Sequence, residues 1–235
     1  MTTRQIYRGV PLNIAGDPSS PRAVIVIQEA FGVNDHIRDV TERFAAAGYF
    51  AVAPELFHRI GSPEIAYDNF PEAMTAMAEL DASGIGSDLG AAAQFLSDAG
   101  YPASATAIVG YCMGGTVTFF AATLGIVGAA ASFYGGGIAA GRFGFAPLLE
   151  LAPQLKSHWI GLYGDQDKGI PVDQVEDLRV AAAEVAFDTE IVRYADAEHG
   201  FHCDGRPAVF NAQAAADAHQ RTLDFFASHL SDKPA

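Results

Sequence analysis

Residues 105–121 have the sequence ATAIVGYCMGGTVTFFA, which predicts a change from strand to helix across a tight turn. The apolar, β-branched run before Gly110 is typical of a buried strand, and the apolar run after Gly115 is typical of a helix. Glycines on both sides of Cys112 let the backbone bend sharply where neighbouring segments come close. A strand, a glycine turn and a helix together form the frame of a nucleophile elbow.

Cys112, at the centre of this turn, has two interpretations. At the N-terminus of a helix the dipole favours the thiolate, and the side chain would be a reactive nucleophile. Elbows usually carry serine in a G-x-S-x-G pattern, however, and a small buried cysteine in a glycine turn is the alternative. The turn alone does not decide between these two roles.

The rest of the chain alternates between strand-like and helix-like segments. We expect strands at residues 23–27, 49–53, 105–109, 128–133, 159–163 and 190–194. We expect helices at residues 34–47, 71–81, 86–98, 116–124, 172–186 and 208–230. This alternation predicts an α/β fold with a mostly parallel central sheet and helices on both faces. Without an internal repeat or a linker-like segment, residues 1–235 are expected to form one domain.

Composition limits the classes of function and partner. The net charge of −14 argues against nucleic acid and anionic membranes as partners, and no stretch is apolar enough to span a membrane. The N-terminus lacks the apolar region of a signal peptide, so we expect a cytoplasmic location and reduced thiols at Cys112 and Cys203, with a disulfide as the alternative. No dinucleotide fingerprint, P-loop or metal-ligand spacing is present, so we expect neither cofactor nor metal. The expected partner is a small molecule, and the oligomeric state stays open.

Two further polar segments follow predicted strands. Asp165 and Asp167 come after one strand, where a carboxylate can orient an imidazole, although both could instead be turn or N-cap residues. His199 comes after the next strand, and a solvent-exposed loop histidine is its alternative. Nucleophile, acid and histidine is the chain order of α/β-hydrolases, whose sites lie at the C-terminal edge of the sheet. We therefore expect a triad of Cys112, His199 and one of the two aspartates.

These segments resemble the dienelactone hydrolase family over nearly the whole chain. The matching motifs are QEAFGVN at 28–34, GYCMGG at 110–115, GDQDKGIP at 164–171, EHGF at 198–201 and RTLDFF at 221–226. A cysteine elbow combined with a glutamate after the first central strand sets this family apart from ordinary serine esterases. The resemblance implies an α/β-hydrolase fold and the cleavage of a lactone or carboxylic ester.

The resemblance also implies roles for individual side chains. It assigns Asp167, rather than Asp165, to His199 and makes Asp165 a residue that caps the loop. It places Glu29 beside the Cys112 thiol, where a buried carboxylate can share or accept the thiol proton near neutral pH. A solvated loop side chain is the alternative for Glu29.

An oxyanion hole is expected from two backbone N–H groups. One belongs to Met113, which follows the nucleophile, and the other to Ala30, in the loop after the first central strand. Together they would bind the negatively charged oxygen of a tetrahedral intermediate.

The residues expected to bind substrate depart from the family pattern. The family holds an anionic substrate with arginines, yet residues 60–141 contain no lysine, arginine or histidine, and Cys203 stands where the second arginine is sought. Arg206 and Arg59 are the available substitutes, and Tyr134 could lend a hydroxyl to the pocket. Solvated arginines and a buried structural tyrosine are the alternatives. Dienelactone and a less polar lactone or ester are therefore both candidate substrates.

Two functions of other classes use the same residues. One is a small-ligand binding protein that keeps the triad only for structure. The other is a thiol redox sensor in which Cys203 resolves an oxidised Cys112, which requires Cα atoms within about 7 Å. The triad already explains Cys112 without either function.

Overall fold

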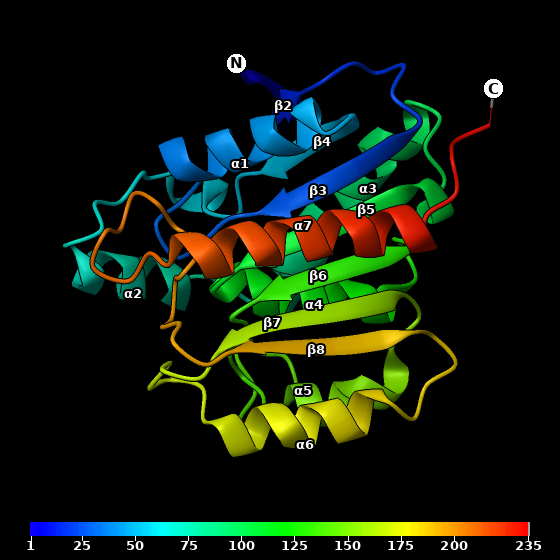
Figure 1. Ribbon diagram of the computed structural model, residues 1–235. Helices are drawn as coiled ribbons and strands as arrows, with labels where there is room; N and C mark the ends of the chain where they lie inside the picture. The colour runs from blue at the N-terminus through cyan, green and yellow to red at the C-terminus, as the bar shows by residue number, and fades with distance from the viewer. Residues whose placement is uncertain (235) are drawn as a thin grey trace.

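The computed structural model describes residues 1–234 and contains an eight-stranded sheet with helices on both faces (Figure 1). Its strands are β1 (Thr3–Tyr7), β2 (Val10–Ala15), β3 (Arg22–Ile27), β4 (Tyr49–Pro54), β5 (Thr106–Tyr111), β6 (Ala129–Phe133), β7 (His158–Gly164) and β8 (Thr189–Tyr194). They follow the order β1-β2-β4-β3-β5-β6-β7-β8. The neighbouring strands from β4 through β3, β5, β6 and β7 to β8 pair in parallel. The pairs β1–β2 and β2–β4 are antiparallel. The predicted α/β-hydrolase fold with a mostly parallel sheet is confirmed.

The helices form a layer on each face of this sheet. They are α1 (Asp35–Ala46), α2 (Phe70–Ala78), α3 (Ala82–Asp98), α4 (Met113–Leu124), α5 (Leu148–Leu151), α6 (Val172–Ala182) and α7 (Ala212–His229), with 3₁₀ turns at His58–Ile60, Ala103–Ala105 and Ala152–Gln154. In Figure 1, α1 and α7 lie in front of the strands, and α3 and α4 lie behind them. Within residues 1–234, no helix has the length and apolar character needed to cross a membrane.

The central strands are buried on both faces, as their sequences require. Residues 23–27 of β3 and 107–109 of β5 have no exposed surface, and this explains their β-branched and small apolar composition. Because β3, β5, β6, β7 and β8 are adjacent and parallel, their C-terminal ends share one edge of the sheet. The loops that follow β3, β5, β7 and β8 therefore bring distant parts of the chain together.

Several boundaries differ from the sequence-based expectation. The hairpin β1–β2 was not predicted, although its turn at Arg8 and Gly9 has the two positive φ values (50° and 85°) of a tight hairpin. Helix α3 begins at Ala82 rather than 86 because Asp81 caps it, accepting the Gly84 N–H at 2.7 Å. Helix α7 begins at Ala212 rather than 208 because Asn211 caps it in the same way. Helix α6 ends at Ala182 rather than 186.

Candidate active site

Cys112 sits at a sharp bend between β5 and α4. Its backbone has φ 56° and ψ −115°, a strained conformation for a non-glycine residue and one that clusters at functional sites. The surrounding glycines are required by close packing. A Cβ on Gly110 would lie 2.1 Å from the Gly114 carbonyl oxygen, and a Cβ on Gly114 would lie 2.5 Å from that of Gln28. The turn therefore has the geometry of a nucleophile elbow.

His199 lies between a carboxylate and the thiol. Its Nδ1 is 2.6 Å from Oδ2 of Asp167, whose Oδ1 accepts the Gly169 N–H at 2.8 Å. Burial of the imidazole lowers its pKa, but the negative charge of Cys112 and the hydrogen bonds with Asp167 and Cys112 outweigh burial and raise the pKa to about 10. The ring thus favours the protonated form beside the Cys112 sulfur, and an imidazolium next to a cysteine activates it as a nucleophile.

A cavity of about 800 Å³ brings these side chains to one surface. Cys112, Asp167 and His199 all line it, although they follow three different strands. Its other walls are partly apolar, with contributions from Phe31, Phe70, Met74, Met77, Ile138, Ile170 and Val209. The cavity is large enough for a small organic substrate.

Glu29 and Tyr134 are buried and do not belong to the lining of this cavity. Glu29 is 1% exposed, and its Oε1 accepts the Tyr134 hydroxyl at 3.2 Å. Burial and the charge of Glu29 hold the pKa of Tyr134 well above its usual range, so the phenol keeps its proton and donates it. The Tyr134 ring also packs against the His199 ring, with centroids 5.0 Å apart. Tyr134 contacts both Glu29 and His199 and is absent from the cavity lining, which agrees with the alternative of a buried structural tyrosine rather than a pocket hydroxyl.

Residues 13–230 match the sequence model of the dienelactone hydrolase family. The chain belongs to this family. It is 38% identical over 233 residues to a Synechocystis sp. protein named "Putative carboxymethylenebutenolidase", with 93% of each chain covered. It is 31% identical over 230 residues to a carboxymethylenebutenolidase from Pseudomonas putida, with 94% of this chain and 92% of that one covered. A "Putative Dienelactone Hydrolase" of known crystal structure from Klebsiella pneumoniae superposes with a TM-score of 0.85 and 33% identity, over 97% of this chain and 99% of that one.

In this dienelactone hydrolase family member, the two candidate acids face different partners. Asp167 meets His199, whereas Asp165 forms a two-pronged ion pair with Arg193, at 2.7 and 2.8 Å. The expectation that Asp165 caps its loop is therefore wrong, because the neighbouring strand β8 offers a guanidinium instead. The catalytic role of Asp167 stays a prediction.

The arginines are placed differently from the expectation. Arg206 lines the cavity, and its guanidinium lies over the Phe31 ring, 5.5 Å from the centroid. Arg59 is absent from the cavity wall, because the fully buried Asp88 on α3 accepts hydrogen bonds from its guanidinium at 2.7 and 2.9 Å. Two cations that sequence reasoning missed, Arg142 and Lys168, line the cavity as well.

Of the two expected oxyanion donors, Met113 follows Cys112 in the sequence, and Ala30 shares a cavity with Cys112. Met113 is the first residue of α4, so its N–H has no acceptor within the helix. Ala30 lines the same cavity as Cys112. The role of these two N–H groups as an oxyanion hole stays a prediction.

Cys203 is buried and not bonded to Cys112. Both cysteines are free, and the Cys203 thiol donates a hydrogen bond to the Tyr67 hydroxyl at 3.2 Å. Burial raises the pKa of Cys203 to about 12, so this thiol is a poor nucleophile. These properties do not favour Cys203 as a resolving thiol in a redox sensor.

Proposed function

We propose that this chain hydrolyses a lactone or carboxylic ester through Cys112, His199 and Asp167. The observation that carries the proposal is the His199 ring, which lies between the Asp167 carboxylate and the thiol and whose pKa is raised to about 10. Membership of the dienelactone hydrolase family supports the same chemistry. Two unpaired thiols fit a cytoplasmic location.

The reaction is an acyl transfer in two stages. The Cys112 thiolate attacks the carbonyl carbon, the C–O bond of the lactone or ester breaks, and His199 gives its proton to the departing alkoxide. In the second stage His199 takes a proton from water, and the hydroxide attacks the thioester, releasing the acid and the thiolate. The N–H groups of Met113 and Ala30 would bind the oxyanion at each stage, and the loss of one such donor costs about 2.7–4 kcal/mol.

Glu29 is proposed to act on the resting thiol. Its buried carboxylate accepts the Tyr134 hydroxyl, and the next residue, Ala30, lines the cavity with Cys112, which supports proton exchange between Glu29 and Cys112 before substrate arrives. The family resemblance is the source of this role.

A carboxylate-bearing substrate fits the cavity best. Arg142, Lys168 and Arg206 line it, and its acidic residues are Asp167, which is paired with His199, and Glu198. Cations gathered at one cavity favour an anion even in a chain whose net charge is −14, because a contact within the cavity is screened less than distant charges. The apolar wall would hold the rest of such a lactone or ester.

The test is a panel of lactones and esters assayed with and without iodoacetamide. We expect thiol-dependent cleavage that Cys112→Ala abolishes. We also expect Asp167→Asn to reduce kcat by about 10²-fold or more, since it removes the partner that orients His199, while the matched Asp165→Asn has little effect. Undiminished turnover in Cys112→Ala would refute the mechanism. Binding of a carboxylate ligand without turnover of any compound would indicate a binding protein instead.

A further inference from the structure

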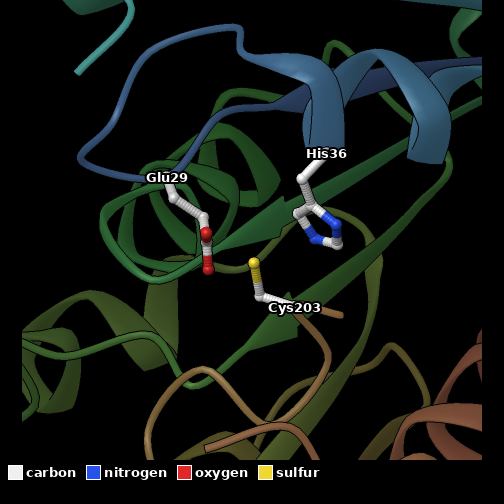
Figure 2. Close-up of side chains that lie close together, drawn as sticks. All are labelled: Glu29, His36 and Cys203. Carbon is white, nitrogen blue, oxygen red and sulfur yellow. The ribbon is translucent and has the colours of Figure 1, made fainter. Parts of the chain in front are cut away.

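A second cluster of buried polar side chains lies beside the proposed catalytic centre. Glu29, His36 and Cys203 each place one donor atom within 4.8 Å of the other two, and all three residues are buried. They come from the loop after β3, the first turn of α1 and the loop before α7. In Figure 2 the carboxylate, the imidazole and the sulfur face a common space.

Glu29 and His36 each have one buried side-chain atom with no hydrogen-bond partner among residues 1–234. They are Oε2 of Glu29 and Nε2 of His36. The opposite atoms of the same groups are held in place: Oε1 of Glu29 accepts the Tyr134 hydroxyl, and Nδ1 of His36 lies 3.1 Å from Oδ1 of Asp204. A proton on Nδ1 that bonds a carboxylate leaves Nε2 with a free lone pair, the arrangement typical of a metal-binding histidine.

We propose that Glu29, His36 and Cys203 bind a divalent transition-metal ion such as Zn²⁺. Carboxylate oxygen, imidazole nitrogen and thiolate sulfur are all zinc ligands, and three of them leave the fourth tetrahedral position to water. On binding, the S–H bond of Cys203 breaks, a sulfur–metal bond forms and the proton passes to solvent. The two anionic ligands then balance the charge of the ion, so the loaded site has no net charge in its buried surroundings.

The geometry requires only a small closure. Zinc bonds of about 2.0–2.3 Å in a tetrahedral arrangement place ligand atoms roughly 3.3–3.6 Å apart. The donor atoms, which lie within 4.8 Å of one another, therefore need to approach by at most about 1.5 Å. Rotation of the three side chains about their own bonds can supply such a movement.

A route for the ion is present on the α1 side of the cluster. A surface groove of about 630 Å³ is lined by His36, Tyr67 and Asp204, among others. The Tyr67 hydroxyl accepts the hydrogen bond of the Cys203 thiol, so displacement of this hydroxyl would open the sulfur to the groove. Asp204 is paired with Arg43 at 2.6 Å, but Asp35, Asp39 and Glu64 also line the groove, so its carboxylates outnumber its arginine and would attract an incoming cation.

Metal binding would also compete with the proposed catalytic use of Glu29. A carboxylate that holds an ion through Oε2 is no longer free to exchange a proton with Cys112. This consequence rests on the proposed function, whereas the binding site itself does not. The experiment therefore measures binding rather than turnover.

Co²⁺ is the probe, because a thiolate ligand gives it a charge-transfer absorption in the near ultraviolet. The titrated protein is Cys112→Ala, in which Cys203 is the remaining thiol of the whole chain. We expect this absorption to appear and to saturate at one Co²⁺ per chain. Competition by Zn²⁺ should then abolish it.

Matched variants assign the ligands. Cys203→Ser in the same background should remove the absorption, and Asp204→Asn should weaken Co²⁺ binding about 10–100-fold by releasing the His36 ring. His229→Gln is the control, since it removes a ligand of the other His/Asp cluster, formed by His158, Asp188 and His229, and should change nothing. Absence of the absorption in folded Cys112→Ala, or its persistence in the Cys203→Ser variant, would overturn the proposal.

Discussion

His199 is subject to opposing influences on its protonation. Burial of the ring favours the neutral form, while the charge of Cys112 and the carboxylate of Asp167 favour the cation and prevail. The sequence suggested these three residues through their order along the chain, but it left Asp165 and Asp167 as alternatives. The family resemblance favoured Asp167, and the contacts in the structure agree with that choice, because Asp167 meets His199 whereas Arg193 of the neighbouring strand engages Asp165.

We expect the His199 ring to titrate near pH 10 and its pKa to fall in Cys112→Ala, which removes the thiolate charge. Because the pKa returns to 6.5 on unfolding, this interaction stabilises the fold fully below pH 6.5, and the stabilisation is lost as the pH rises through about 10. NMR of the imidazole carbon as a function of pH measures the midpoint. A midpoint near 6.5 that Cys112→Ala leaves unchanged would contradict the proposed pair.

At the scale of elements, the elbow depends on how closely α4 approaches the end of β3. The sequence predicted this approach from the glycines alone, together with most of the central strands. The sequence did not predict the hairpin of β1 and β2. Its first strand, β1, is an exposed edge strand and lacks the apolar alternation that identifies a half-buried strand. The helix starts at Ala82 and Ala212 were also missed, although the capping residues Asp81 and Asn211 carried the signal.

Gly114→Ala tests the close approach of α4 and β3. The added Cβ would lie 2.5 Å from the carbonyl oxygen of Gln28 and 2.6 Å from that of Ile27, so the backbone must shift. We expect the free energy of unfolding in urea to fall by about 1–3 kcal/mol. The control is Gly90→Ala within α3, where nothing lies within 4 Å of the new Cβ, and we expect it to be neutral or to stabilise by about 0.5–1 kcal/mol. Equal stabilities of the two variants would show that the elbow is not tightly packed.

At the scale of the whole molecule, the cavity lining is richer in cations than the chain as a whole. The chain carries a net charge of −14, yet Arg142, Lys168 and Arg206 line one cavity. The sequence offered Arg206 and Arg59 as candidate anchors for an anionic substrate, but it could not say which loops turn inward. Because loop orientation cannot be read from the sequence, Arg142 was overlooked as a cavity residue, and Arg59, which lies outside the cavity lining, was proposed. Likewise, no spacing could reveal the cluster of Glu29, His36 and Cys203, since the fold assembles it from three distant segments.

Arg206→Gln tests the cavity as an anion site. We expect KM for a carboxylate-bearing lactone to rise about ten- to a hundredfold, with little change for its neutral methyl ester, because one charge-assisted contact is lost. Arg59→Gln is the matched control. It should leave both KM values unchanged and instead lower the free energy of unfolding by on the order of 1–3 kcal/mol, since buried Asp88 loses a partner. Equal effects of Arg206→Gln on both substrates would exclude a specific anion contact.

The most direct measurement for the whole account is the mass of the protein during turnover of a slow, activated ester. Our mechanism predicts that the acyl group is attached as a thioester to the peptide containing Cys112, and that this adduct accumulates when Asp167→Asn or His199→Ala slows its hydrolysis. An acyl group attached to another residue, or turnover with no adduct in any of these proteins, would contradict it.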